Sequence, residues 1–368
     1  MSKWEMVRLG DVLEYEQPTK YIVESTNYDD NYITPVLTAG QSFILGYTNE
    51  TSNVFYELPV IIFDDFTTAI KYVDFPFKVK SSAMKILKAT EKVYIKYVFY
   101  YMNTIRTDTQ LHKRYWISKY ANIQLPLPPL SAQRQIADVL DKVVSLISKR
   151  KQQLEQLDLL VKSRFVEMFG EPVANEMGWN TLPLEKACVS IVDCPHSTPN
   201  YTNENTGFMC IRTSIVKRNC ILWEDIEYIS EDEFLSRIKR KKPQKGDVIY
   251  TREGAILGIA AIIDRDCDVA LGQRSMLLSV NTDICLPEFL SLMMNFDSFL
   301  NKVLEGVSGS ASPHINVGDI RAYNVIIPPL PLQNAFADFV HQTDKSKFSV
   351  VNGLDLTFSI YIKALNTI

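Results

Sequence analysis

Two adjacent carboxylates, Asp64 and Asp65, have the residue types and the spacing that a hydrolytic site would need. They follow the apolar run 60–63, and paired carboxylates at a strand end can hold a divalent cation for phosphodiester cleavage. No acidic-x-Lys element follows to complete such a site. Strand-end carboxylates more commonly stabilise a turn, so the sequence favours a structural role.

A metal site is the second possibility, because Cys194 and His196 are metal-ligand types in one short segment. Two lone ligands make a poor site, since structural zinc usually takes four. All six cysteines fall in the second half of the chain, without a CxxC pair: Cys188, Cys194, Cys210, Cys220, Cys267 and Cys285. We expect reduced, mostly buried thiols. With no signal segment and no apolar run of about 18 residues, we expect a cytoplasmic protein without a membrane partner.

Other catalytic motifs are missing from the sequence. There is no Asn/Asp-Pro-Pro-aromatic tetrapeptide of an adenine methyltransferase, no glycine-rich cofactor loop and no GxxxxGK[ST] phosphate loop. We therefore expect a chain that binds without catalysing, and that holds no cofactor itself.

Cations that could contact DNA are concentrated before the turn Gly246-Asp247. They are Arg237, Lys239, Arg240, Lys241, Lys242 and Lys245. Such a run can clamp phosphates, which position a protein on DNA without conveying sequence. A solvated helix face is an equally good interpretation. The formal net charge of −4 requires any DNA surface to be a local patch.

The first half of the chain offers two further groups of cations. They are Lys78, Lys80, Lys85 and Lys88, which alternate along a strand-like stretch, and Lys113, Arg114 and Lys119 around an aromatic pair. The alternation predicts one basic face. The mixture of cations and aromatic rings suits DNA, and it also suits packing against helices.

These residues are positioned by a fold that the sequence predicts twice. Five blocks recur in the same order at a spacing that grows from 175 to 200, among them 60–63 with 247–250, and Pro128-Pro129-Leu130 with Pro328-Pro329-Leu330. Ordered recurrence indicates an internal duplication. Each copy begins with short β-rich runs, such as 60–63, 73–79 and 247–250, and with one or two helices, which predicts an α+β domain.

Each copy then continues as a long helix. The segment 131–168 contains no Gly or Pro and would extend roughly 55 Å as a helix. Its stripe of apolar residues recurs every seven positions: Leu140, Ile147, Leu154, Val161 and Met168. The second segment has a less regular stripe of Val351, Leu354, Phe358, Tyr361, Leu365 and Ile368, which Gly353 interrupts.

Two such stripes in one chain can bury each other as an antiparallel coiled coil. The alternative is that each helix belongs only to the core of its own domain. An antiparallel pair with a globular domain at each end would act as a ruler on DNA, placing two reading heads about one helical turn apart.

Taken together, the motifs of the chain resemble those of the specificity subunit of type I restriction-modification systems. The resemblance rests on Trp-x-x-x-x-Leu near each domain start, a Gly-Asp-Val-Ile strand, Gly272-Gln273-Arg274, and Ile-Pro-Pro-Leu-x-x-Gln opening a long helix. The segment 193–199 is similar to one common class of target-recognition domain. The first copy resembles another class through 37–41 and 62–66. Gly353 and the start of the second helix depart from the pattern.

The resemblance implies two target-recognition domains in a pseudo-twofold arrangement, residues 1–127 and 171–327, with spacer helices at 128–170 and 328–368. It implies a split double-stranded DNA target, with one half read by each domain. It also implies assembly with two modification subunits, which bind S-adenosylmethionine and methylate adenine, and with restriction subunits.

By position in the resembling motifs, Gln41 would read bases in the first domain, and His196, Arg252 and Arg274 in the second. Base readout in the major groove favours such side chains on loops. Two alternatives remain open at this point. One is a two-module protein-binding scaffold, and the other is the recognition part of a self-sufficient methyltransferase.

Overall fold

The computed structural model describes residues 4–38, 42–105, 115–254, 256–305 and 314–366. The chain divides into two compact units. The first unit comprises residues 1–152 and 351–368, and the second comprises residues 153–350. Each unit therefore contains an α+β globular part and a portion of both long helices. No helix in the described ranges has the length and apolar composition to cross a membrane.

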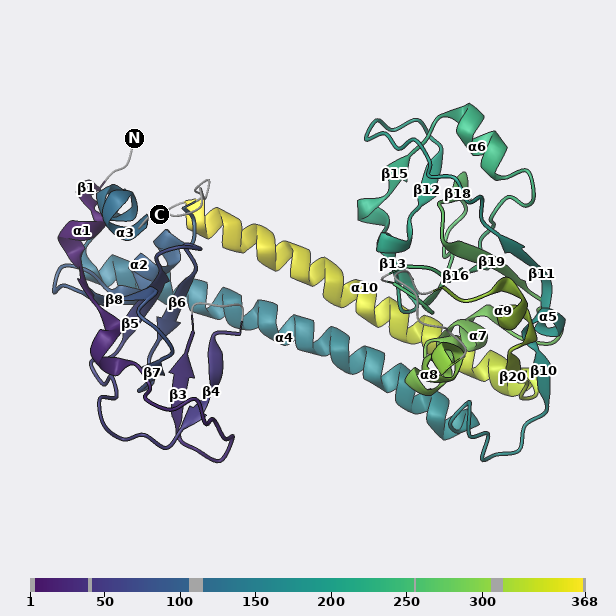
Figure 1. Cartoon of the computed structure of the whole chain (residues 1–368). Coiled ribbons are helices and arrows are strands. Elements are labelled where there is room, and N and C mark those ends of the chain that lie inside the picture. The colour runs from purple at the N-terminus through teal and green to yellow at the C-terminus, as the bar shows by residue number, and fades with distance from the viewer. Residues whose placement is uncertain (1–3, 39–41, 106–114, 255, 306–313, 367–368) are drawn as a thin grey trace. The chain divides into compact units, whose positions relative to one another are not determined.

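The first unit is built on a four-stranded antiparallel sheet (Figure 1). Its strand order is β2 (Leu13–Glu16), β8 (Met84–Ala89), β5 (Val60–Asp64) and β6 (Ile70–Val73). A smaller sheet places β3 (Thr34–Leu37) between antiparallel β4 (Ile44–Thr48) and parallel β7 (Lys78–Val79). β1 (Glu5–Arg8) pairs with β9 (Gln124–Leu127). The remaining elements are α1 (Leu9–Val12), η1 (Pro18–Tyr21), α2 (Ile95–Met102), α3 (Tyr115–Ser118) and η2 (Tyr120–Asn122).

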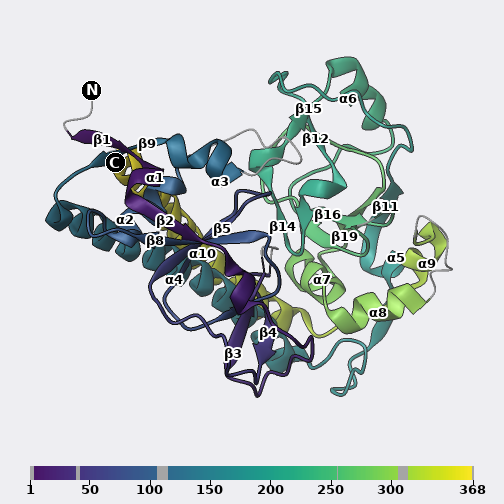
Figure 2. The same ribbon diagram turned by 60° about the vertical axis from the view of Figure 1, so that its left-hand side comes forward.

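The second unit repeats this topology. Its main sheet has the order β11 (Cys188–Asp193), β19 (Ser275–Val280), β16 (Val248–Thr251) and β17 (Ala260–Ile262). Figures 1 and 2 both show β11, β19 and β16 side by side. The small sheet places β12 (Met209–Ile211) between antiparallel β15 (Glu227–Tyr228) and parallel β18 (Val269–Leu271), and β10 (Thr181–Pro183) pairs with β20 (Asn324–Ile326). The matching strand order confirms the predicted duplication.

The second copy is longer because of insertions and extra helices. A hairpin of β13 (Val216–Lys217) and β14 (Cys220–Ile221) has no counterpart among the described strands of the first unit. The other elements are α5 (Leu184–Ala187), η3 (Thr213–Ile215), η4 (Trp223–Asp225), α6 (Glu231–Arg237), α7 (Pro287–Met294), α8 (Asp297–Glu305) and α9 (Val317–Ala322). The insertions explain why the spacing between repeated blocks grows along the sequence.

One predicted strand is wrong. The run 73–79 was expected to be continuous, but β6 ends at Val73 and β7 begins at Lys78. Pro76 lies between them, and proline cannot donate to a strand ladder. The two pieces consequently join different sheets, β6 next to β5 and β7 next to β3.

Both long helices form as predicted. They are α4 (Leu130–Phe169, 40 residues) and α10 (Leu330–Asn366, 37 residues). Within the first unit, Leu140 near the start of α4 belongs to a cluster against which Tyr361 and Leu365 near the end of α10 pack. Within the second unit, the rings of Phe165 and Phe336 lie 5.5 Å apart. The start of each helix therefore contacts the end of the other, and the pair is antiparallel.

The inner face of α10 differs from its predicted stripe. Val351 and Phe358 were expected inside but are 40% and 37% exposed, whereas Thr343 and Thr357 are buried. Each threonine hydroxyl donates to the carbonyl four residues earlier, which satisfies its hydrogen bond inside the helix pair. Gly353 packs against the Arg150 guanidinium, which an added Cβ atom would have to displace. The apolar stripe is therefore interrupted by small and polar residues.

Candidate nucleic-acid interface

The paired carboxylates of the first unit hold a turn. The Asp64 side chain accepts the backbone N–H groups of Phe66 and Thr67, at 2.8 and 3.1 Å. Asp65 accepts the Trp116 N–H at 2.8 Å and lies 3.5 Å from the Lys85 ammonium. Both carboxylates are buried. The two carboxylates thus bind groups of the protein itself, as the structural interpretation predicted.

Cys194 and His196 do not converge on a common point. The Cys194 thiol is buried and accepts the Ser275 N–H, while His196 is exposed and faces a carboxylate. Among the described residues, no group of three metal-ligand side chains is close enough to hold an ion. Burial raises the pKa of the Cys188 and Cys210 thiols to about 12, so these two are unreactive at neutral pH.

The second unit instead brings several loops together at the end of β11. Arg252, which follows β16, binds both carboxylate oxygens of Asp193, the last residue of β11, at 2.9 and 3.2 Å. Its third guanidinium nitrogen lies 2.6 Å from Glu253. The Arg252 N–H also donates to the carbonyl of Arg274, in the connection that leads to β19. The ion pair therefore joins the end of β11 to the loop after β16, and the backbone hydrogen bond joins that loop to the segment before β19.

His196 belongs to this cluster and remains accessible. Its Nε2 atom lies 3.1 Å from the same Asp193 carboxylate, and its side chain is 67% exposed. Arg237 stabilises the loop that carries His196, because its buried guanidinium donates to the Ser197 carbonyl at 2.7 Å. Arg274 is also exposed. An edge that presents an imidazole and a guanidinium offers hydrogen-bonding groups to base edges.

Arg252 itself was expected to read bases, and its burial argues against a direct contact. Only 5% of the residue is exposed, and all of its guanidinium nitrogens face carboxylates of this unit. Its position fixes the loops around it. In this structure Arg252 positions the loops, and its contact with DNA stays a prediction.

Some cations of the basic run after α6 contact polar or acidic groups of the protein, and others are exposed to solvent. Because α6 ends at Arg237 and Pro243 follows, residues 239–245 form no helix, and the helix-face interpretation is wrong. Lys241 is turned inward against the Ser190 and Ser279 hydroxyls, and Lys242 pairs with Asp268. Lys239 and Arg240 are exposed.

In the first unit, fewer of the predicted cations are exposed and able to contact DNA. Lys78 and Lys85 are buried and paired with Glu50 and Asp65, so the expected basic face along 78–88 does not form. Lys80 and Lys119 are exposed, and the Lys80 ammonium lies 5.9 Å from the centre of the Tyr28 ring. Gln41, Lys113 and Arg114 lie outside the described residues.

Two residues that shape this site were not identified from the sequence. Asp193 organises the recognition loops, although a lone carboxylate at a strand end gave no signal beyond the motif in which it stands. Arg321, in α9, is exposed and donates to the Ile191 carbonyl of β11 at 3.0 Å. It stands apart from other cations in the sequence, so composition alone could not single it out.

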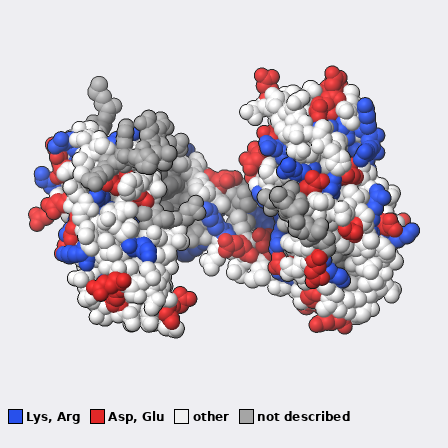
Figure 3. Space-filling view, viewed as in Figure 1, with Lys and Arg blue, Asp and Glu red and all other residues white. Residues whose placement is uncertain are grey.

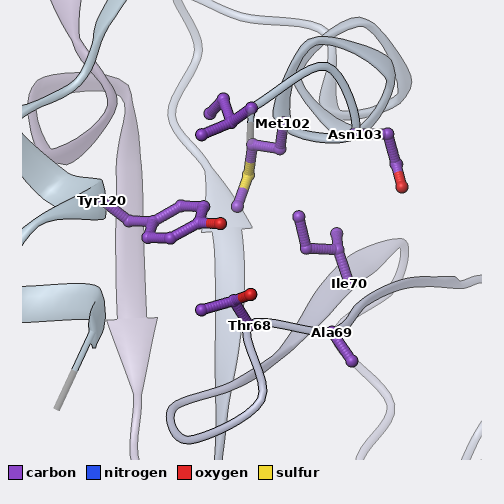
Figure 4. A pocket seen from close by; sticks show the side chains of 7 residues that line it. Thr68, Ala69, Ile70, Met102, Asn103 and Tyr120 are labelled. Atoms are coloured by element: carbon purple, nitrogen blue, oxygen red, sulfur yellow. The ribbon is translucent and has the colours of Figure 1, made fainter. Parts of the chain in front are cut away.

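A cavity of about 380 Å³ also opens in the first unit (Figure 4). Thr68, Ile70, Met102, Asn103 and Tyr120 are among the residues that line it. Its described lining contains no carboxylate, imidazole or thiol.

Comparison with known proteins gives consistent relatives. A family model described as the type I restriction modification DNA specificity domain matches residues 1–157 and 194–355. The EcoR124I/EcoR124II specificity subunit of Escherichia coli is 48% identical over 158 residues, which cover 39% of each chain. The MjaVIII specificity subunit of Methanocaldococcus jannaschii is 24% identical over 404 aligned positions, covering 99% of this chain and 94% of that one.

Solved structures show the same fold. The crystal structure of a type I restriction-modification S subunit from M. genitalium matches with a TM-score of 0.60 at 12% identity, covering 100% of this chain and 96% of that one. A structure described in terms of complex assembly and conformational transition of a type I system matches with a TM-score of 0.52 at 18% identity, covering 99% and 96%.

Proposed function

Because this chain belongs to the type I restriction-modification DNA specificity family, we propose that it binds a split DNA target, with one half-site bound by each unit. The family provides DNA sequence specificity and is not catalytic. The chain is accordingly a recognition subunit, and neither a scaffold for protein ligands nor a self-sufficient methyltransferase. It would bind cellular DNA, so its proposed place of action is the cytoplasm.

The repeated strand order carries this proposal. Two units of the same topology, each built on a four-stranded sheet of equivalent order, supply two similar platforms whose loops differ. Different loops on a common platform can read different sequences. The antiparallel helices α4 and α10 would set the number of unspecified base pairs between the half-sites.

Within each unit, we assign the exposed candidates to two kinds of contact. In the second unit, His196 and Arg274 would contact bases, and Lys239 and Arg240 would contact phosphates. Lys80 and Lys119 are the corresponding phosphate candidates of the first unit. Gln41, Lys113, Arg114 and Lys242 stay predictions for DNA contact.

The long helices would also bind partner subunits. Large apolar side chains on α4 remain exposed, including Leu146, Leu159 and Leu160, and so do Phe348 and Leu356 on α10. Exposed apolar side chains along helices are typical of protein interfaces. We propose that two modification subunits bind here, supply S-adenosylmethionine and methylate adenine, and that restriction subunits join the same complex.

Mapping of methylated adenines tests the proposal. The full chain would be produced with a type I modification subunit in a host without adenine methylation. We expect one bipartite motif with a fixed spacer. A single uninterrupted motif would contradict reading by two units. In parallel, fluorescence anisotropy of the full chain with random-sequence duplex should show binding that weakens steeply with salt.

A further inference from the structure

The edge of β11 carries two anchored guanidinium groups. β11 is the outer strand of its sheet, because it pairs with β19 on one side and with no other described strand. Arg321 donates to the carbonyl of Ile191 at 3.0 Å, and Arg240 donates to the carbonyl of Asp193 at 3.4 Å. Two side chains from distant segments thus cover the unpaired carbonyls of one strand edge.

Each of these guanidinium groups has N–H donors that its bond to the strand does not use. Arginine has five N–H donors in a planar fork that matches phosphate oxygens. Both residues are exposed, and within the described chain neither forms an ion pair with a carboxylate. Their remaining donors therefore face solvent, while the bond to the strand limits the conformations of the side chain.

The charges around the edge leave these two cations uncompensated. The Asp193 carboxylate is balanced by Arg252, and Lys241 and Lys242 are matched by Asp247 and Asp268. On α9, the Asp319 carboxylate accepts a hydrogen bond from the neutral Asn316 amide and forms no ion pair with Arg321 in the described chain. In Figure 3, Lys and Arg side chains gather on the side of the second unit where α6 and β11 lie in Figure 1. The local field is thus favourable for an anion although the whole chain is acidic.

We propose that the β11 edge, with Arg240 and Arg321, is a phosphate-binding rail that seats one DNA strand against the second unit. This inference rests on the proposed function. Carbonyls two residues apart on a strand are roughly 7 Å apart, so the two guanidinium groups can bind neighbouring phosphates of one DNA strand.

The phosphate-binding rail lies next to the loop that carries His196. Arg240 binds the backbone of Asp193, and His196 lies against the side chain of the same residue. A backbone phosphate fixed at Arg240 would place the adjoining groove next to His196. Phosphate contacts thereby set the register in which bases are read.

Salt-dependent binding of random-sequence duplex by the full chain tests the rail. Arg321→Gln and Arg240→Gln should each lower affinity about equally for any sequence, and each should reduce the slope of log affinity against log salt by about 1. Arg321→Lys should keep most of the slope, because it keeps the charge. Arg265→Gln is the matched control, since its guanidinium binds Asp264 and covers the Trp223 ring.

The possible outcomes separate the rail from the proposed function. Unchanged slopes in both Gln variants would overturn the rail, as would a changed motif in methylation mapping with an unchanged slope. If the unaltered chain showed no salt-dependent binding, the proposed function would fail and the rail with it. Circular dichroism of each variant shows whether a loss reflects misfolding, and Arg321→Lys provides a second variant that preserves the charge.

Discussion

Gln133 and Gln333 make the same three hydrogen bonds in the two units. Each side-chain carbonyl accepts a backbone N–H from the segment before a helix, Tyr94 at 2.7 Å and Leu286 at 2.8 Å. Each amide donates to the carbonyl of the first proline of the Pro-Pro-Leu motif, at 2.8 and 2.7 Å, and to a second carbonyl in the segment before the helix, that of Lys92 or Ile284. Both residues are completely buried. The glutamine of the motif therefore fixes each long helix to its globular part.

Replacing either glutamine with leucine should destabilise its unit. Gln133→Leu removes the side-chain partner of the Tyr94 N–H and of two carbonyls, those of Lys92 and Pro128, and the free energy of unfolding should fall by about 2–4 kcal/mol. Urea denaturation measures the change. Gln152→Leu, at an exposed position of the same helix, should change it by less than about 0.5 kcal/mol. Equal effects of the two substitutions would contradict a role for the buried bonds.

The Arg252–Asp193 ion pair should be required for reading one half-site only. Arg252→Gln leaves Asp193 and Glu253 without their buried cation, which should destabilise the second unit by about 3 kcal/mol. Methylation mapping should show relaxed specificity in the half-site bound by the second unit and normal specificity in the other. Lys302→Gln, an exposed cation of the same unit, is the control. Relaxation of both half-sites would argue against local positioning.

The architecture could be predicted largely from sequence because it depends on repeated local patterns. Apolar runs such as 60–63 become central strands, and a glycine-free heptad stripe becomes α4, in which Leu140 and Val161 are buried. The pattern was insufficient where one residue changes the local geometry. Pro76 divides the run 73–79 between two sheets, and Gly353, which interrupts the expected stripe of α10, packs against the Arg150 guanidinium.

The site was predicted less completely because burial depends on partners that are distant in sequence. The exposure of His196 and Arg274 fits their position on loops. Arg252 looks identical to a DNA-contacting arginine until its partner, 59 residues away, is placed beside it. Arg321 acquires its position from a carbonyl 130 residues away. No local pattern contains either relationship.

The stability of the first unit should depend on pH through Glu50. Burial of Glu50 disfavours its charge, but hydrogen bonds from Lys78 and from the backbone of Ser25 and Glu24 outweigh burial and lower its pKa. A carboxyl with a lowered pKa in the folded state stabilises the fold above the unfolded pKa of about 4.3. That contribution is lost as pH falls through the lower folded-state value.

Glu50→Gln should accordingly lower stability at pH 7 by about 3 kcal/mol, because Lys78 is buried and loses its partner. The difference from the unaltered chain should shrink as the pH falls below about 4. Urea midpoints across this range measure it. Glu91→Gln, an exposed position of the same unit, provides the baseline. A difference that stays constant with pH would show that the charge of Glu50 is not responsible.

Shortening the helix pair should change the spacer without changing either half-site. Removing 148–154 from α4 together with 349–355 from α10 deletes one heptad from each helix and leaves the Asp158–Lys347 ion pair in place. Seven residues shorten a helix by roughly 10 Å, which corresponds to about three base pairs of DNA. Methylation mapping should therefore return both original half-sites at a shorter separation. A variant that removes 148–154 alone mismatches the two helices and should be less stable in urea, which separates spacing from folding. If the paired deletion altered the sequence of a half-site, the helices could not be acting as the ruler.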